Sequence, residues 1–291
     1  MKNTLYLIDA MHLIFRAYYA IPEFYNPDKS IMTNAVYGYI RTLINIIKQK
    51  QPSYCAAIFD CGPQTFRNNL LPSYKQNRGD APPELIPQFK FSYQISEAIG
   101  VKCYKKKNYE ADDLIATLTH FATKRNKRVV IITNDKDLCQ LVGPSVSIWN
   151  ISKNVILRSG DVVNKFSVKP CQIPDFIGLA GDTADNIPGV AGIGPKTASI
   201  LLKQYSTLEK LYAKLHKQDP CLLPRKDTTM AQLLKHKDMA LLSKTIATLI
   251  PNVPIHVQLA DLRRRKINIK QLSRIYRKLG FAEPKEQDLF L

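Results

Sequence analysis

Apolar residues in the first half of the chain alternate between short continuous runs and helically spaced stretches. The continuous runs, which are typical of strands buried on both faces, cover residues 5–8, 55–59, 101–104 and 129–133. Helical spacing covers 11–19, 34–48, the end of a helix at 94–99, and 111–125. This alternation predicts an α/β fold with a mostly parallel central sheet flanked by helices. Residues 145–151 and 155–157 are expected to form a hairpin at the sheet edge.

The second half of the chain has a different pattern, because apolar strands no longer interrupt the helical spacing. We expect helices at 162–166, 173–179, 198–204, 208–215, 230–249 and 269–279. The 291 residues are therefore expected to form an N-terminal α/β domain, 1–160, and a C-terminal helical domain, 161–291.

Residues 61–95 break the alternation of the N-terminal half. The segment combines prolines with basic and aromatic residues, namely Pro63, Pro72, Pro82, Pro83, Pro87, Arg67, Lys75, Arg78, Lys90, Phe66, Tyr74, Phe89, Phe91 and Tyr93. A long insertion of this kind between a strand and the next helix is usually functional when it is ordered.

The net charge of the chain limits the classes of partner that it is expected to bind. A formal net charge of +18 favours nucleic acid, with an anionic membrane surface second. No apolar run reaches the roughly 20 residues of a membrane span, and Asp9 interrupts the N-terminal run too early for a signal peptide, so we expect a cytoplasmic protein. The cysteines are expected to be buried free thiols rather than zinc ligands or disulfides. They are Cys55, Cys61, Cys103, Cys139, Cys171 and Cys221.

Acidic residues gather at the predicted ends of the strands, although the chain as a whole is basic. They are Asp9 and Asp60 after the first two apolar runs, Asp135 and Asp137 after a later run, Glu110, Asp112 and Asp113 at the start of the 111–125 helix, and Asp182 and Asp185 in one turn. Each of them alone could be a helix cap. Parallel strands, however, bring their carboxyl ends to one edge, where functional sites lie, and acids crowded there repel one another unless cations share them.

An all-oxygen set of this kind, without His or Cys, suits Mg²⁺ or Mn²⁺ rather than zinc. In a basic chain it favours a two-metal phosphodiester hydrolase. One ion would generate the attacking hydroxide, and the other would stabilise the leaving oxygen.

A glycine-rich stretch follows the last acid pair. Gly192, Ile193 and Gly194 lead into Lys196 and Thr197 at the start of a helix, where backbone N–H groups and the lysine favour a phosphate. The stretch lacks the preceding strand of a dinucleotide fingerprint and the Walker spacing. We interpret it as a helix-hairpin-helix at about 187–205 that binds the duplex backbone; the alternative is a plain structural turn. The basic run 263–266 is either a solvated face or a phosphate contact.

In this order the motifs resemble those of the 5′-nuclease domain (flap endonuclease, 5′→3′ exonuclease) of bacterial DNA polymerase I and of its stand-alone and phage relatives. The motifs are Leu-Ile-Asp9, Phe-Asp60, Phe66-Arg67, Tyr74-Lys75-x-x-Arg78, Tyr109-Glu110-Ala111-Asp112-Asp113, Asn134-Asp135-Lys136-Asp137, Gly181-Asp182-x-x-Asp185-Asn186 and Gly189-x-x-Gly192-Ile193-Gly194-x-Lys196-Thr197-Ala198. The resemblance covers nearly the whole chain. It implies a PIN-like nuclease fold with a helical arch, or clamp, at 67–95, and cleavage of flaps and 5′ strands, RNA primers included, at single-strand/duplex junctions.

The resemblance also implies roles for individual residues. The first metal site would take Asp9, Asp60, Glu110, Asp112, Asp113 and Asp135, and the second would take Asp137, Asp182 and Asp185. Lys75 and Arg78 would stabilise charge on the scissile phosphate, Tyr74 would stack on a base, and Arg16 would face the substrate phosphates. The DNA contacts would be Arg67, Gly192, Ile193, Gly194, Lys196 and Thr197. Two Mg²⁺ ions are implied, with Mn²⁺ able to substitute, and a K⁺ ion at the hairpin.

The partners implied are DNA with 5′ flaps or ends, RNA/DNA hybrids and a DNA polymerase, for a stand-alone monomer near the nucleoid. Two residues depart from the family pattern. Asn69 replaces a common acid of the clamp, and Ala10 replaces the glycine after the first Asp, which narrows that turn. Two alternatives remain. One is a catalytically silent junction-binding protein whose acids hold structural cations; the other is a toxin-like ribonuclease, although such chains lack this hairpin and clamp.

Overall fold

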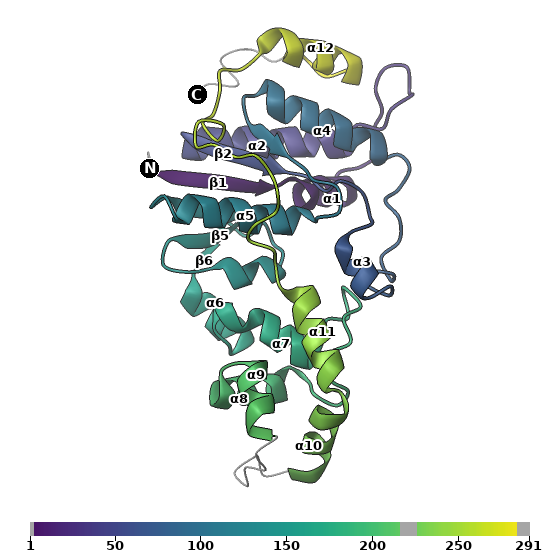
Figure 1. Ribbon diagram of the computed structural model, residues 1–291. Helices are drawn as coiled ribbons and strands as arrows, with labels where there is room; N and C mark the ends of the chain where they lie inside the picture. Colours follow the sequence, from purple (N-terminus) through teal and green to yellow (C-terminus); the bar gives the residue numbers. More distant parts are fainter. Residues whose placement is uncertain (1–2, 216–225, 284–291) are drawn as a thin grey trace.

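A computed structural model describes residues 3–215 and 226–283, and a six-stranded sheet forms the centre of the N-terminal half (Figure 1). The strands are β1 (Thr4–Asp9), β2 (Tyr54–Ile58), β3 (Lys102–Tyr104), β4 (Arg128–Ile132), β5 (Val146–Asn150) and β6 (Val155–Leu157). Their order is β3-β2-β1-β4-β5-β6; β1 to β5 run parallel, and only β6 is antiparallel. The predicted parallel sheet and edge hairpin are confirmed.

The sheet has a topological switch beside its first strand. From β1 the chain moves outward to β2 and β3, and it then returns to place β4 on the other side of β1. The connections that leave β1 and β4 therefore diverge, and in open α/β sheets functional sites lie at such a switch point, outside the carboxyl ends of the strands.

Helices cover both faces of the sheet because neighbouring strand residues point to opposite sides. Tyr6 and Ile8 lie in the core beneath α1 (Ala10–Ala20), α2 (Asn34–Lys50), α4 (Ile86–Ala98) and α12 (Ile269–Leu279). Leu5 and Leu7 lie in the core beneath α5 (Ala111–Thr123), and that core continues into the C-terminal helices. All six residues of β1 are at least partly buried, so the apolar run 5–8 reflects burial on both faces.

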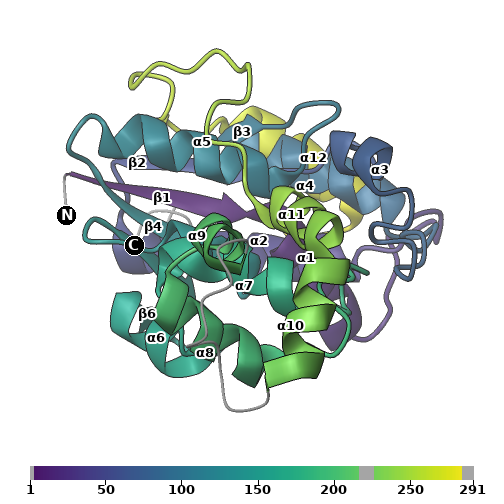
Figure 2. The same cartoon turned by 60° about the horizontal axis from the view of Figure 1, so that its bottom comes forward.

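Between residues 159 and 247 the chain is mostly helical, and this part gathers on one side of the sheet (Figure 2). Its helices are α6 (Ser159–Phe166), α7 (Ile173–Ala180), α8 (Pro195–Tyr205), α9 (Leu208–Leu215), α10 (Lys226–Lys235) and α11 (Lys237–Ala247). Short turns of helix are α3 (Phe66–Leu70), η1 (Asp137–Leu141) and η2 (Pro170–Gln172). The single helix predicted for 230–249 is wrong, because the backbone of His236 (φ −108°, ψ 22°) separates α10 from α11.

The end of the described chain returns to the α/β body. The Cys55 N–H donates to the carbonyl of Leu262 at 2.9 Å, and the Arg265 N–H donates to the carbonyl of Gly100 at 2.9 Å. Helix α12 then packs over α4 (Figure 1), with Leu272 and Ile275 in the same core as the sheet. The assignment of all of 161–291 to a C-terminal domain is therefore wrong for α12. The backbone of the basic run 263–266 is used for this return, while the Arg263 and Arg265 side chains are exposed.

Residues 67–95, where the arch was expected, divide into three parts. They are α3, the turns at 71–85 and α4; α4 is packed onto the body through Phe91 and Ile95, and the turns are anchored in the core at Tyr74 and Leu85. We call the turns at 71–85 the clamp segment, because they hold Lys75 and Arg78 of the predicted clamp.

The five described cysteines are free, as predicted. Cys61 and Cys171 are nevertheless exposed, so the prediction of burial holds only for Cys55, Cys103 and Cys139. Cys221 lies outside the described residues. Among the described helices, none is both long and apolar enough to cross a membrane.

Candidate active site

The carboxyl ends of β1 and β2 each fix one acid beside the start of a helix. Asp9 caps α1, accepting the His12 N–H at 3.0 Å, and its other oxygen accepts the Thr133 hydroxyl at 2.8 Å. Asp60 accepts the N–H of Ala111, the first residue of α5, at 2.7 Å. The same caps that start the helices therefore bring Asp9, Asp60 and the acids of α5 to one edge of the sheet.

A tight loop between α7 and α8 supplies the last two acids. Asp182 and Ile187 exchange backbone hydrogen bonds of 2.8 Å each, which close the loop around Asp185. Gly181 has a φ of +72°, and a Cβ there would lie 2.7 Å from the Ile187 carbonyl oxygen. Only glycine allows this close return of the chain, and both aspartates are held buried by it.

Eight acids thus meet along what we call the carboxylate edge. They are Asp9, Asp60, Glu110, Asp112, Asp135, Asp137, Asp182 and Asp185. The charge of Asp135 acts on four of the others, Asp9, Asp112, Asp137 and Asp185. The pKa values of Asp9 and Asp137 are each raised to about 7, first by burial and also by the charge of Asp135. Burial followed by Asp135 also holds the pKa of Asp112 well above its usual range.

The pKa of Asp185 is raised as well, first by burial; Lys75 and Arg78 oppose the shift, and Asp182 and Asp135 add to it. The field of Asp135 therefore reaches acids from β1, α5 and the 181–189 loop. Carboxyls whose pKa values rise together at one site are short of positive charge there.

Three cations of the chain partly supply that charge. The Lys75 Nζ lies 2.9 Å from the Glu110 Oε2 and 3.6 Å from the Asp185 Oδ2. Arg78 forms an ion pair with Asp185. The Lys136 Nζ lies 2.6 Å from the Asp182 Oδ2. Lysines and arginine thus lie between carboxylates that would otherwise face one another.

The segment 71–85 is also tied to the 181–189 loop through its backbone. The Lys75 N–H donates to the Asp185 carbonyl at 2.9 Å, and the Asn186 side chain donates to the Ser73 carbonyl at 2.6 Å. The Asn77 side chain donates to the Thr183 carbonyl at 2.8 Å. The clamp segment is therefore docked directly over the carboxylate edge.

The structure corrects the roles predicted for Asp113 and Arg67. Arg67 is 1% exposed and holds the fully buried Asp113 through two hydrogen bonds of 2.7 and 2.8 Å. The Arg67 Nε also donates to the Ile246 carbonyl at 2.8 Å, and Asp113 accepts the Ile250 N–H at 3.0 Å. Neither side chain can reach a metal ion or DNA; the pair instead ties α3 and α5 to the end of α11.

The stacking role predicted for Tyr74 is also wrong in this structure. Its side chain is buried, and its hydroxyl donates to the Glu110 Oε2 at 3.2 Å. A ring enclosed in this way cannot lie against a base, so Tyr74 holds Glu110 instead.

The donor chemistry of the carboxylate edge suits a hard divalent ion, because all its ligands are oxygens. The buried Oδ1 of Asp137 has no hydrogen-bond partner among the described residues, which leaves it available. As the side chains stand, however, no three His, Cys, Asp or Glu residues within 3–215 and 226–283 are close enough to hold an ion. The residues therefore fit Mg²⁺ in kind, and Asp9, Asp60, Glu110, Asp112, Asp135, Asp137, Asp182 and Asp185 are the ones that would hold it.

The predicted DNA contacts lie at two other places. Arg16 is exposed on α1. In the hairpin, Gly192 and Gly194 have open space where a Cβ would stand, and Lys196 is exposed. Thr197 is half-buried. Ile193 is 4% exposed and packs in the core, so a side-chain contact of Ile193 with DNA is wrong, and only its backbone is available.

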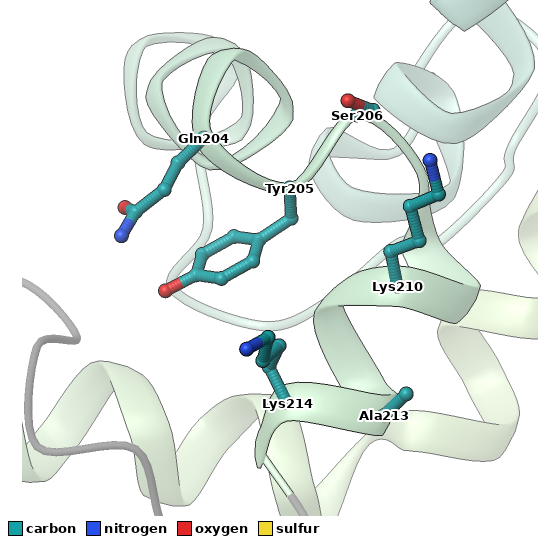
Figure 3. A pocket seen from close by; sticks show the side chains of 6 residues that line it. All are labelled: Gln204, Tyr205, Ser206, Lys210, Ala213 and Lys214. Carbon is teal, nitrogen blue, oxygen red and sulfur yellow. The ribbon is translucent and has the colours of Figure 1, made fainter.

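A cavity of about 400 Å³ lies at the other end of α8, away from the acids. It is lined by Gln204, Tyr205, Ser206, Lys210, Ala213 and Lys214 from the end of α8 and from α9 (Figure 3). Because no carboxylate lines it, this cavity is not part of the carboxylate edge.

Residues 4–167 match the family model of the 5′-3′ exonuclease N-terminal resolvase-like domain, and residues 168–270 match that of the 5′-3′ exonuclease C-terminal SAM fold. The chain belongs to the 5′-3′ exonuclease family. This family membership confirms the resemblance inferred from the motifs.

Two relatives show how the family is organised. A 5′-3′ exonuclease of Buchnera aphidicola (subsp. Schizaphis graminum) is 32% identical over 97% of this chain and 98% of its own length. DNA polymerase I of Bacillus caldotenax is 37% identical over 97% of this chain, but over only 32% of the polymerase. The chain thus spans about a third of the polymerase relatives and nearly all of the exonuclease relative.

Solved structures share the fold. The T5 5′-exonuclease with bound divalent metal ions (zinc) has a TM-score of 0.71 at 20% identity, over 85% of this chain and 90% of that one. The catalytic core of Rad2 in complex with DNA substrate has a TM-score of 0.66 at 13% identity, over 99% and 91%.

Two residues of the site were missed from the sequence. Thr133 joins two acids, and Lys136 pairs with a third. Lys136 stood inside the Asn-Asp-Lys-Asp motif and could have been chosen for its charge. Thr133 ends an apolar strand, and nothing in its spacing marked it.

Proposed function

We propose that the protein is a Mg²⁺-dependent, structure-specific 5′→3′ exonuclease and flap endonuclease that hydrolyses phosphodiester bonds at single-strand/duplex DNA junctions. The observation that carries the proposal is the convergence of buried acids from both halves of the chain at the carboxylate edge. Burial first, and then the charges of neighbouring acids, raise the pKa of Asp9, Asp137 and Asp185 there. Repulsion of this kind is relieved most strongly by divalent cations. The formal net charge of +18 favours binding of a polyanion.

Two Mg²⁺ ions, when bound, would activate a water molecule and stabilise the leaving oxygen. Asp9, Asp60, Glu110, Asp112 and Asp135 would hold the first, and Asp137, Asp182 and Asp185 the second. Mn²⁺ has the same preference for oxygen ligands and would substitute.

The cations of the clamp segment have a second use in this proposal. Lys75 and Arg78 now contact Glu110 and Asp185. Once the acids bind metal ions, the ammonium and guanidinium groups would exchange carboxylate for the scissile phosphate, which offers the same charge and geometry. Their place beside the acids positions them for charge developing in the transition state.

Binding of the duplex is assigned to the hairpin and to α1. The exposed backbone at Gly192 and Gly194 allows a phosphate to approach the start of α8, and Lys196 adds a positive charge. A K⁺ ion bridging that backbone and a phosphate would strengthen the contact. Arg16 would face phosphates nearer the acids.

The relatives support a role in replication and repair. The match to DNA polymerase I favours RNA primers in RNA/DNA hybrids as substrates and a DNA polymerase as partner. We further propose that the protein acts as a monomer in the cytoplasm, associated with the nucleoid. A catalytically silent junction-binding role is not favoured by any feature of the site, since its eight acids are all present.

A flap assay with mapped products tests the proposal. A 5′-labelled flap on a duplex is incubated with Mg²⁺, with Mn²⁺ and with EDTA. We expect a product cut at the junction with either ion and none with EDTA. The exposed Asp238→Asn variant on α11 serves as a matched control for loss of a carboxylate. A lack of product with both ions would contradict the proposal.

A further inference from the structure

The carboxyl ends of β1 and β4 contain a hydroxyl, that of Thr133, to which no motif assigned a role. Ile8 pairs with Ile132 in the parallel register, so the next residues, Asp9 and Thr133, lie side by side where the chain leaves the sheet. This is the topological switch point of the fold. A side chain at this place borders the acids from both strand ends.

The Thr133 hydroxyl makes two hydrogen bonds of opposite kind. It donates to the Asp9 Oδ2 at 2.8 Å and accepts the N–H of Asp135 at 3.0 Å. Thr133 is 1% exposed, so water does not compete for either bond. The hydroxyl therefore joins the carboxylate at the end of β1 to the backbone that follows β4.

The connection extends in both directions from Thr133. The other Asp9 oxygen accepts the His12 N–H at 3.0 Å, so both oxygens of this carboxylate are fixed. The Asp135 Oδ1 in turn accepts the Asp137 N–H at 2.9 Å. Three acids of the carboxylate edge thus depend on one chain of hydrogen bonds.

We propose that Thr133 is a positioning residue for metal binding, whose hydroxyl holds the Asp9 carboxylate and the Asp135 backbone in the mutual orientation that lets both acids bind one divalent ion. The inference rests on the proposed function, because it assumes that these acids are metal ligands. Threonine suits the task, since its β-branched side chain has few rotamers. Partners that orient metal ligands commonly change metal affinity by about 10- to 100-fold when they are removed.

Three substitutions separate the hydroxyl from the rest of the side chain. Thr133→Val keeps the shape and the burial but loses both hydrogen bonds. Thr133→Ser keeps the hydroxyl and loses the methyl group. Thr133→Cys keeps a weak donor of similar size. A role in packing alone would be damaged most by Ser, whereas a role of the hydroxyl would be damaged most by Val.

The experiment measures Mn²⁺ binding to the full chain, without DNA, by electron paramagnetic resonance, together with thermal unfolding in EDTA. We expect Thr133→Val to weaken Mn²⁺ binding about 10-fold or more while the EDTA melting curve stays cooperative. Thr133→Ser should bind within about threefold of the wild type, and Thr133→Cys should lie between Ser and Val. If Thr133→Val does not fold, the Cys and Ser variants decide.

The outcomes are distinct. Wild-type Mn²⁺ affinity in folded Thr133→Val, or in Thr133→Cys where Val does not fold, overturns this inference and leaves the proposed function intact. A loss in Thr133→Ser as large as in Thr133→Val also overturns it, because packing would then explain both. Failure of the wild-type protein to bind Mn²⁺ at all overturns the proposed function and the inference together.

Discussion

Asp112 and Asp113 are neighbours at the start of α5, yet they belong to two different electrostatic environments. Asp112 lies at the carboxylate edge, where burial and the charges of Asp135 and Asp9 raise its pKa well above the usual range. Asp113 lies inside the protein, where Arg67 neutralises it through two hydrogen bonds. Asp112 is repelled by the neighbouring carboxylates, and a bound cation would relieve that repulsion. The charge of Asp113 is already compensated by Arg67.

This difference indicates which acids are available to bind a metal ion. A carboxylate that is fully paired stabilises the fold and offers no lone pair to an ion. A carboxylate that is buried among other acids costs folding energy, and it repays that cost only when a cation binds. We therefore expect the buried acids that lack a compensating cation, such as Asp112, to serve function. The acids that are fully paired, such as Asp113, are expected to serve stability.

The largest expected effect distinguishes the roles of Asp112 and Asp113. Asp112→Asn should reduce cleavage of a 5′ flap by about a thousandfold or more, since metal ions contribute several kcal/mol to such a barrier. Its melting temperature in EDTA should stay the same or rise, because a repelled charge is removed. Asp113→Asn should instead lower the melting temperature. Kinetics and thermal unfolding of both variants make the comparison, and an active Asp112→Asn would contradict the metal site.

The next effect concerns the buried pair. Arg67→Met should reduce the free energy of unfolding by about 3–5 kcal/mol, because it leaves Asp113 charged and unpaired in the interior. The same substitution at Arg78, which is half exposed beside Asp185, should change stability little. Urea unfolding measures both. Equal stability of the two variants would show that the Arg67–Asp113 pair is not a structural anchor.

The double variant Arg67→Met/Asp113→Leu sharpens this result. Replacing both members of a buried ion pair by apolar residues is often neutral or stabilising. We expect the double variant to recover much of the stability that Arg67→Met loses. If it recovers nothing, the backbone contacts of Arg67 with Ile246 and Thr248 carry the stability instead.

A smaller effect is the pH dependence of the metal-free protein. Asp9 and Asp137 have pKa values of about 7 in the folded protein, raised first by burial, from 3.8. Between about pH 4 and pH 7 the folded state keeps protons that the unfolded chain has released. The free energy of unfolding therefore falls as pH rises through this window, by roughly 2 kcal/mol per group between pH 5 and pH 7.

Urea unfolding in EDTA at pH 5 and pH 7 measures this dependence. The Asp9→Asn variant should lose the share due to Asp9, and saturating Mg²⁺ should raise stability most at pH 7, where both acids can lose their protons. Stability that is flat or rises with pH in EDTA would contradict the repulsion at the carboxylate edge.

Much of the fold could be predicted from the sequence because its signals are local. The continuous apolar runs ending at Asp9 and Asp60 identified buried parallel strands, and parallel topology alone then brought their acids together. The predicted helix at 230–249 failed because His236 interrupts it without a proline or glycine to mark the break. The position of α12 could not be predicted from the local sequence either. Its amphipathic pattern predicts a buried face but does not indicate which core that face covers.

The site was harder to predict where side-chain direction mattered. Glu110, Asp112 and Asp113 look alike in a motif, but a helix turns about 100° per residue, so adjacent acids face different surroundings. The partners that bury Arg67 include Ile246 and Thr248, about 180 positions away along the chain. Tyr74 was predicted to stack its aromatic ring on a base. In the structure the ring is buried, and the hydroxyl instead donates a hydrogen bond to Glu110.

The smallest expected effect lies far from both environments, at the hairpin. Lys196 is exposed, and no ion pair joins it to an acid among the described residues, so its charge is free for a phosphate. Lys196→Ala should weaken duplex binding a few-fold and reduce the log–log salt slope by about 0.9, the contribution of one phosphate contact. Binding titrations at four salt concentrations measure the slope, with the exposed Lys203 on the same helix changed to Ala as the matched control.

A slope that is unaltered in Lys196→Ala, or lowered equally in both variants, would contradict duplex binding at the start of α8. Because Lys196 touches neither the carboxylate edge nor the Arg67–Asp113 pair, its variant should leave metal binding and stability unchanged, which keeps recognition of the duplex separable from cleavage.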